Sequence, residues 1–170
     1  GTALSSTQLN ATANVAGTFV YTPASGAILD AGTHILSVVF TPTDTVNYNT
    51  STDTASINVT KAGTTITWSD PSDVIYGTAL SSTQLNATAN VAGTFVYTPA
   101  SGTVLSAGTH TLSTTFTPTN AINYNIVVRT VSINVYSFPT LNISANPVSI
   151  TYGQSSTLTW SSTNTTSCTA

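Results

Sequence analysis

The two histidines are the first candidates for chemistry, because imidazole binds metals and exchanges protons near neutral pH. His34 and His110 are the only histidines, and each follows the same three residues, Ala-Gly-Thr. A zinc site needs several ligands close together, and neither histidine has a cysteine or a second histidine near it in sequence. We therefore expect no metal site at either position. Each ring should lie near the end of a strand with its polar edge toward solvent.

Carboxylates could support acid–base catalysis, and three of the five acidic residues lie in the stretch around His34: Asp30, Asp44 and Asp53. The equivalent positions around His110 hold no acid: Ser106, Asn120 and Arg129. Chemistry common to both stretches is therefore excluded. An acid pair acting in the first stretch alone would lack a recognisable His or Lys partner. We predict no catalytic residue and no enzymatic activity.

Asp70 and Asp73 enclose a proline and a serine in the pattern Asp-Pro-Ser-Asp. Carboxylate oxygens are preferred ligands of Ca²⁺, but the ion takes about six to eight oxygens, so two carboxylates would hold it weakly. The same residues also suit a stiff, polar turn. Asp70 and Asp73 are therefore weak calcium candidates with a turn as the alternative, and no cofactor is expected elsewhere.

The charge of the chain excludes two kinds of partner. Charged residues make up 4% of the sequence, the formal net charge is −3, and Lys61 and Arg129 are the only basic residues. Nucleic acids and anionic membranes both require a basic surface, so neither is an expected partner. The apolar runs are also far shorter than the ~20 residues that span a bilayer, so no membrane insertion is expected.

An internal repeat organises the chain. The segment 1–26 recurs letter for letter as 77–102, so Gly1 corresponds to Gly77 and His34 to His110. The period of this repeat exceeds the ~20 to ~50 residues of solenoid repeats, so each unit should close a core of its own. We predict a first domain at 1–61 that lacks its opening strands, a complete domain at 62–137 and the truncated start of a different domain at 138–170.

Alternating apolar and polar residues predict strands, beginning with one at 9–15, and no segment has the pattern of a helix. The stretch 33–41 places Leu36 and Phe40 on one face. The second copy keeps them as Leu112 and Phe116, whereas two residues of the opposite face become threonine. These four residues should therefore point into the core. Further strands are expected in the last part of the chain at 141–145, 148–152 and 156–160.

Aromatic residues raise the possibility of carbohydrate binding, which uses exposed aromatic surfaces. Phe19 and Tyr21 share one face of the predicted strand 18–22, and Val20 lies on the other. An aromatic pair opposite a lone valine is more often on the core side, so we predict that both rings point inward. Glycan binding stays open as an alternative.

Short strands separated by turns predict an all-β fold with two packed antiparallel sheets. The motifs of the repeat are Tyr-Gly-Thr-Ala-Leu, Phe-Val-Tyr-Thr-Pro, Ala-Gly-Thr-His-x-Leu and a Phe-Thr-Pro-Thr turn that leads to Asn-Tyr. With these motifs, residues 1–136 resemble bacterial immunoglobulin-like repeats. The resemblance implies tandem immunoglobulin-like antiparallel β-sandwiches of the kind found in large secreted or surface-attached bacterial proteins, where they serve as stalks, spacers and adhesive segments.

Two further expectations accompany this resemblance. Tyr48 and Tyr124 precede the last strand of each copy and are candidates for a tyrosine corner, in which the hydroxyl bonds back to a nearby backbone group. The segment after Pro139 resembles a second bacterial immunoglobulin-like type, in which the cysteine at the position of Cys168 usually has a later cysteine as its partner. We therefore expect Cys168 to form a disulfide with a cysteine beyond Ala170.

Together these observations predict a non-enzymatic structural or spacer array in a secreted or cell-surface bacterial protein, serving adhesion or projection. Its partners would be the neighbouring domains of the same chain, with a host or matrix glycan or protein as a further candidate. Because the chain opens with Gly1, we expect it to be an internal part of a longer protein. The alternative is a carbohydrate- or protein-binding accessory module of a larger extracellular protein or enzyme.

Overall fold

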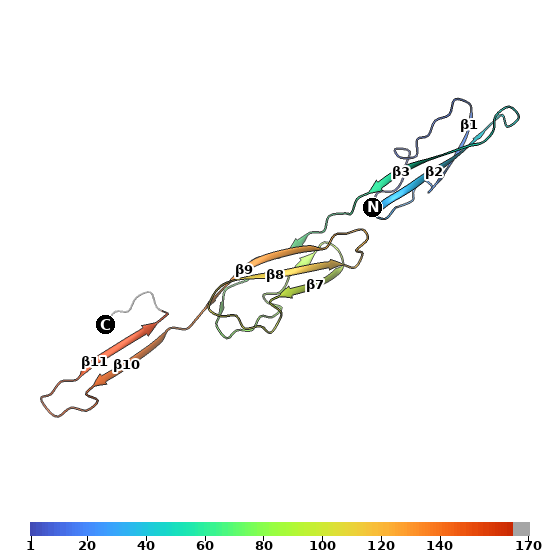
Figure 1. Cartoon of the computed structure of the whole chain (residues 1–170). Helices are drawn as coiled ribbons and strands as arrows, with labels where there is room; N and C mark the ends of the chain where they lie inside the picture. The colour runs from blue at the N-terminus through green and yellow to red at the C-terminus, as the bar shows by residue number, and fades with distance from the viewer. Residues whose placement is uncertain (165–170) are drawn as a thin grey trace. The chain divides into compact units, whose positions relative to one another are not determined.

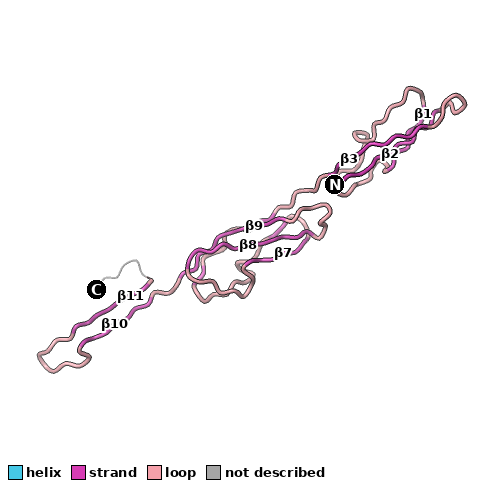
Figure 2. The backbone as a smooth tube through the Cα atoms, viewed as in Figure 1, coloured by secondary structure: helices cyan, strands magenta, loops and turns pink. Residues whose placement is uncertain are grey.

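The computed structural model describes residues 1–164, and its regular elements are strands (Figures 1 and 2). No helix occurs in this range, which confirms the all-β prediction. It follows that none of these residues forms a helix that could cross a membrane.

The first copy of the repeat contains one antiparallel sheet with the order β1-β2-β3. Its strands are β1 (Gly17–Thr22), β2 (Gly32–Pro42) and β3 (Ser51–Val59). Phe19 on β1 lies opposite Phe40 on β2, and their ring centroids are 4.9 Å apart. The pairing therefore places large apolar side chains next to each other on one face of the sheet.

The second copy has two sheets. One is four-stranded, in the order β5 (Val74–Ile75), β9 (Val127–Tyr136), β8 (Gly108–Pro118) and β7 (Gly93–Thr98). The other pairs β4 (Ile66–Thr67) with β6 (Thr88–Ala89). The Trp68 ring, next to β4, meets the Tyr97 ring on β7 edge to face, with centroids 5.4 Å apart. Side chains of the two sheets thus meet in a common core, as in a β-sandwich.

The strand expected at 9–15 does not form in the first copy. In the second copy only β6 forms in the equivalent stretch, and its partner is β4. A strand needs a neighbour for its backbone hydrogen bonds. In the first copy no described strand pairs with the stretch 9–15, so the prediction is wrong there.

The last described part of the chain is an antiparallel hairpin of β10 (Thr140–Asn146) and β11 (Thr157–Thr163). Two of the three strands predicted here are present, and the one at 148–152 is not. That stretch lies in the connection between β10 and β11, where Val148 is 92% exposed and no described strand pairs with it.

Each copy has its own set of buried leucines. Leu4, Leu9 and Leu36 form a cluster in the first copy. The equivalent residues Leu80, Leu85 and Leu112 are all buried in the second. The four residues predicted to face the core are buried as well, with exposed fractions of 8% for Leu36, 9% for Phe40, 0% for Leu112 and 1% for Phe116.

The described residues divide into two compact units. The first contains residues 1–66 together with 89–94 and 116–127, and the second contains 67–88, 95–115 and the described residues from 128 onward. Inside the first unit, the Asn123 side chain donates to Asp30 Oδ1 at 2.7 Å and accepts from the Ala31 amide at 2.6 Å. Lys61 Nζ also donates to the Ala121 carbonyl at 2.7 Å. These bonds connect residues of the segment 116–127 with the first copy.

Gly93 on β7 is required by close packing. A Cβ at this position would overlap the Phe116 ring and the Thr117 carbonyl oxygen, and Gly17 has the same relation to Phe40 and Thr41. We expect Gly93→Ala to lower the free energy of unfolding by about 1–3 kcal/mol, because the extra methyl overpacks a buried contact. Gly63→Ala is the control, since the space around Gly63 is open. Urea unfolding of both variants checks this, and equal stabilities would contradict it.

Candidate functional site

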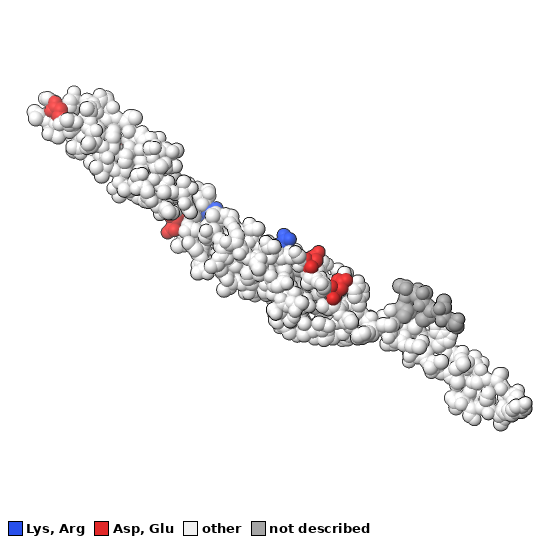
Figure 3. Space-filling model, turned by 180° about the vertical axis from the view of Figure 1, so that it is seen from behind, with Lys and Arg blue, Asp and Glu red and all other residues white. Residues whose placement is uncertain are grey.

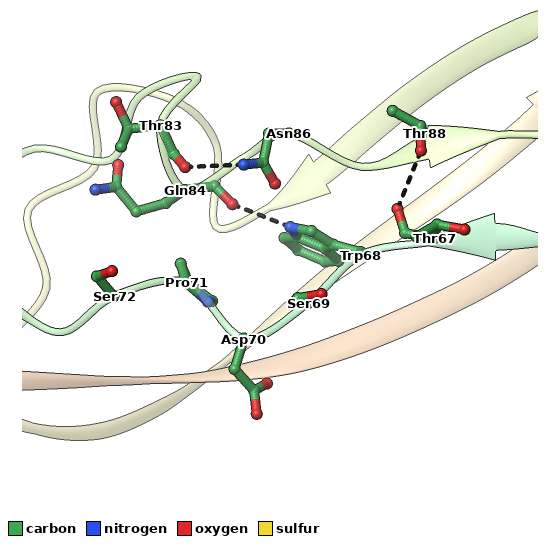
Figure 4. A pocket seen from close by; sticks show the side chains of 10 residues that line it. All are labelled: Thr67, Trp68, Ser69, Asp70, Pro71, Ser72, Thr83, Gln84, Asn86 and Thr88. Carbon is green, nitrogen blue, oxygen red and sulfur yellow. Dashed lines mark hydrogen bonds between the residues drawn. The ribbon is translucent and has the colours of Figure 1, made fainter.

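A hollow of about 390 Å³ lies beside the stretch that contains Trp68 and Asp70 (Figure 4). Its lining residues are largely polar and come from two segments: Thr67, Trp68, Ser69, Asp70, Pro71 and Ser72 from one, and Thr83, Gln84, Asn86 and Thr88 from the other. Most of these side chains carry a hydroxyl or an amide, and Asp70 carries the only charge among them.

Trp68 joins the two segments of this hollow. Its Nε1 donates to the Gln84 carbonyl at 3.0 Å, and the side chain is 2% exposed. The dashed lines of Figure 4 show this bond together with those from Asn86 to the Thr83 carbonyl and from Thr88 to the Thr67 carbonyl. Because the indole ring is buried, it stabilises the core and offers no surface on which a sugar could stack.

Gln84 has a structural role that the sequence analysis did not predict. Its Oε1 accepts from the Ser81 amide at 3.1 Å and from Ser81 Oγ at 3.2 Å, and the amide of Leu85 donates to the Ser81 carbonyl at 2.9 Å. Ser5 and Gln8 make the same bonds in the first copy. The signal was present in the sequence, since Ser-x-x-Gln is the pattern of a capping box at a helical turn.

The two weak calcium candidates bond to β9. Asp70 Oδ1 accepts from the Ser132 amide at 2.8 Å, and Asp73 Oδ1 accepts from the Asn134 amide at 3.3 Å and from the Asn134 side chain at 3.1 Å. Among residues 1–164 no group of three or more His, Cys, Asp or Glu side chains comes together. Each carboxylate thus fixes residues 70–73 against β9, and this segment is irregular, without the expected turn.

Asp73 also accepts a hydrogen bond from the Tyr136 hydroxyl at 3.1 Å. This bond, with the negative charge of Asp73, raises the pKa of Tyr136 above its ordinary value of 10.0. Since the neutral phenol is the form favoured in the folded state, its contribution to stability is complete below pH 10.0 and is lost as the pH rises through the folded-state pKa.

We therefore expect Asp73→Asn to lower the pKa of Tyr136, because the acceptor loses its charge and the phenolate is no longer repelled. An NMR titration of the Tyr136 ring between pH 8 and 12 measures this change. Asp70→Asn is the matched control, since Asp70 bonds to Ser132 and should leave the Tyr136 titration unchanged. A Tyr136 pKa that is equal in Asp73→Asn and the native chain would contradict the assignment.

Tyr48 and Tyr124 do not show the hydrogen bond expected of a tyrosine corner. In the described part of the chain, the tyrosine hydroxyls that accept from a backbone amide are those of Tyr21, from Ala11 at 2.9 Å, and of Tyr97, from Ala87 at 2.9 Å. Tyr48 is 48% exposed and Tyr124 is half-buried. The hydroxyl bond is found on β1 and β7 because these tyrosines lie between the sheet and the loop that covers it.

The remaining candidates have structural partners. The Nε2 atoms of His34 and His110 lie 2.8 Å from the carbonyls of Asp30 and Ser106, four residues earlier, and both rings are half-buried. Asp44 accepts from the Asn47 side chain at 2.8 Å, and this bond and others within the turn hold the pKa of Asp44 below 3.8. Cys168 lies outside the described residues.

The predicted inward face of 18–22 is confirmed. Phe19 and Tyr21 are half-buried, whereas Val20 is 62% exposed. The two rings stack on each other with centroids 6.3 Å apart, and Phe95 and Tyr97 repeat the arrangement at 6.1 Å. These four rings therefore pack as part of the core.

A comparison of the sequence with models of known protein families finds no match, and a comparison with curated proteins finds none either. Any statement about function therefore rests on the residues and their geometry.

Proposed function

We propose that this chain is a non-enzymatic array of immunoglobulin-like domains that spaces or projects other parts of a secreted or cell-surface bacterial protein. The observation that carries the proposal is the duplicated core: Leu4, Leu9 and Leu36 are buried in one copy, and their equivalents are buried in the other. A unit that buries its own apolar residues can be repeated along a chain without changing its neighbours.

Two further features support a structural role. Four polar side chains of the hollow bond to its own backbone carbonyls or to β9, namely those of Trp68, Asp70, Asn86 and Thr88, so these hydrogen bonds hold segments of the fold together. The face of the molecule in Figure 3 carries few acidic or basic side chains, and these are scattered over it. Few groups on this surface change their charge with pH, which suits a protein that meets variable conditions outside a cell.

The spacer proposal is tested by adding one further copy of the repeated unit, 62–137, to the intact chain. Strands of nine to eleven residues at ~3.3 Å per residue give a unit roughly 30 Å long. We expect the maximum dimension measured by small-angle X-ray scattering to increase by about that length. An unchanged maximum dimension would mean that the units pack side by side, which contradicts a spacer.

Binding of a glycan is the second candidate function, and one observation favours it. Tyr76 and Tyr136 are 59% and 58% exposed, and the Tyr76 amide donates to the Tyr136 carbonyl at 2.7 Å. Exposed aromatic rings on adjacent backbones are suited to stacking on a sugar. A glycan array with the intact chain tests this alternative. A reproducible sugar-specific signal that is lost in Tyr136→Ala would favour binding over spacing.

A further inference from the structure

The hollow beside Trp68 contains two side-chain amides that are each fixed at one end. Gln84 Oε1 accepts from the Ser81 amide and from Ser81 Oγ, so the Nε2 atom of the same side chain faces the other way. Asn86 Nδ2 donates to the Thr83 carbonyl at 3.1 Å, which likewise fixes the direction of Oδ1. Because these bonds orient both amides, Gln84 presents a donor at its other end and Asn86 presents an acceptor.

The donor of Gln84 belongs to a buried residue. Gln84 is 7% exposed, and its Nε2 atom makes no hydrogen bond with any residue of 1–164. In that range, Thr64 Oγ1 is the polar side-chain atom that is fully buried without a partner, so Gln84 Nε2 reaches open space. Since Gln84 lines the hollow, this space is the hollow itself. A donor in this position costs free energy unless another molecule accepts from it.

The acceptor of Asn86 faces open space as well. Its Oδ1 atom has no partner in the described part of the chain, and the residue is exposed. In Figure 4 this oxygen points away from Thr83, and the Gln84 amide lies between Thr83 and Ser72. Pro71 is half-buried and gives the same hollow an apolar wall. A donor, an acceptor and an apolar surface therefore border one volume.

The charges around the hollow favour a neutral ligand. The described residues that line it include no basic side chain. Asp70 Oδ1 accepts from the Ser132 amide of β9, and in Figure 4 the carboxylate points away from Gln84 and Asn86. An anionic ligand would therefore gain no ion pair here, and an ammonium group could not accept from Gln84. The ligand must instead offer an acceptor and a donor without a charge.

The size and the rim of the hollow narrow the choice among neutral ligands. Its volume of about 390 Å³ lies at the small end of ligand pockets, which range from ~300 to ~1,000 Å³. Exposed hydroxyls line it, namely those of Thr67, Ser69, Ser72 and Thr83. A hydroxyl both donates and accepts, so this rim suits a ring with several hydroxyls of its own. An extended peptide would need a longer free strand edge than β4 offers with its two residues.

We propose that the hollow beside Trp68 binds an N-acetylated sugar, with the acetamido carbonyl accepting from Gln84 Nε2 and the acetamido N–H donating to Asn86 Oδ1. The acetamido methyl packs on Pro71, and the ring hydroxyls bond to the serine and threonine hydroxyls of the rim. Trp68 holds the Gln84 backbone in place and takes no part in stacking. This site is separate from the exposed tyrosine pair, and it does not depend on the spacer role.

The test uses the intact chain and the methyl β-glycosides of N-acetylglucosamine and N-acetylgalactosamine, each titrated into the millimolar range. We expect saturable NMR shifts with one or both sugars, largest at the amides of Leu85 and Asn86 and at the indole N–H of Trp68. The corresponding sugars with a hydroxyl or an ammonium in place of the acetamido group should bind about tenfold more weakly or less, because both hydrogen bonds of the acetamido group are lost.

Gln84→Glu separates binding from folding. Glutamate keeps an oxygen for the Ser81 amide, as in a capping box, but replaces the Nε2 donor by a second acceptor. We expect sugar binding to weaken by about tenfold or more, while the Leu85 amide keeps its protection from exchange. Gln8→Glu is the matched control, because Gln8 makes the same bonds to Ser5 and does not line this hollow. It should leave the shifts in the second copy unchanged.

Ser72→Leu tests the same site if Gln84→Glu does not fold. Ser72 is exposed at the rim, so a larger apolar side chain fills the hollow without entering the core and should abolish binding. Ser82→Leu is its control, because Ser82 is exposed and lies outside the lining. Tyr136→Ala should also leave binding intact, which distinguishes this hollow from the exposed tyrosine pair.

Four results would overturn the proposal. The first is the absence of saturable shifts in the second copy with both acetamido sugars. The second is equally tight binding of the sugars that lack the acetamido group. The third is unchanged binding in a folded Gln84→Glu or Ser72→Leu chain. The fourth is loss of binding in Tyr136→Ala, which would place the sugar on the tyrosine pair.

Discussion

Replacing Trp68 by alanine is expected to lower the free energy of unfolding of the second copy by about 3–5 kcal/mol, the largest effect of any single change considered for this chain. The side chain is 2% exposed, packs on Tyr97 and donates to the Gln84 carbonyl. Its removal therefore leaves a cavity and an unpaired buried carbonyl at once. Urea unfolding followed by circular dichroism measures the change.

Trp160→Ala is the matched control for this prediction, because Trp160 is 44% exposed on the hairpin β10–β11. We expect it to change the stability of the second copy by less than about 0.5 kcal/mol. Equal losses of stability in the two variants would show that Trp68 is not part of the core.

Leu112→Ala is expected to cost about 2–5 kcal/mol, because Leu112 on β8 is 0% exposed and its truncation leaves a cavity between the sheets. Val96→Ala is the control on the neighbouring strand, where the side chain is 65% exposed. We expect the control to stay within about 0.5 kcal/mol of the native chain in the same urea unfolding experiment. A loss below about 1 kcal/mol for Leu112→Ala would contradict the assignment of this residue to the core.

The sequence was sufficient to predict the inward faces of the longest strands. Leu36 and Phe40 could be placed because the second copy keeps them as Leu112 and Phe116 while their opposite neighbours change. The face that keeps its leucine and phenylalanine is the buried one, although this face also contains one change to threonine, from Val38 to Thr114, which is 0% exposed. The same comparison removed Asp44 from consideration as a catalytic acid, and the structure places it in a turn with Asn47.

Strand pairing could not be predicted in the same way, because it depends on which neighbour is available. The stretch 9–15 has a strand pattern, but its neighbour in the second copy is β4, which comes from outside the segment that is identical in both copies. The stretch 148–152 fails for a related reason, since it lies in the connection of a hairpin. The local sequence pattern indicates a preference for an extended backbone. A sheet forms only where a neighbouring strand is available to pair with it.

Side-chain hydrogen bonds to the backbone were also beyond the sequence prediction. The hydroxyls of Tyr21 and Tyr97 accept from backbone amides, whereas Tyr48 and Tyr124 had been expected to bond to the backbone. This bond depends on how the loop at residues 9–15, or its equivalent in the second copy, crosses the sheet. Asp70 suggested a cation ligand in sequence but accepts from a β9 amide in the structure. The residue types show that these groups can form hydrogen bonds, but their partners depend on the fold.

The central claim is that each copy closes a core of its own. The most direct test is hydrogen exchange of the intact chain carrying Leu36→Ala. Leu36 belongs to the cluster with Leu4 and Leu9 in the first copy. We expect the amides of β2 and β3 to lose protection by a factor of about 30 or more, corresponding to a loss of about 2–5 kcal/mol, while those of the central residues of β8 and β9 keep theirs. A parallel loss of protection in β8 and β9 would contradict the claim, because it would mean that the two copies share a single core.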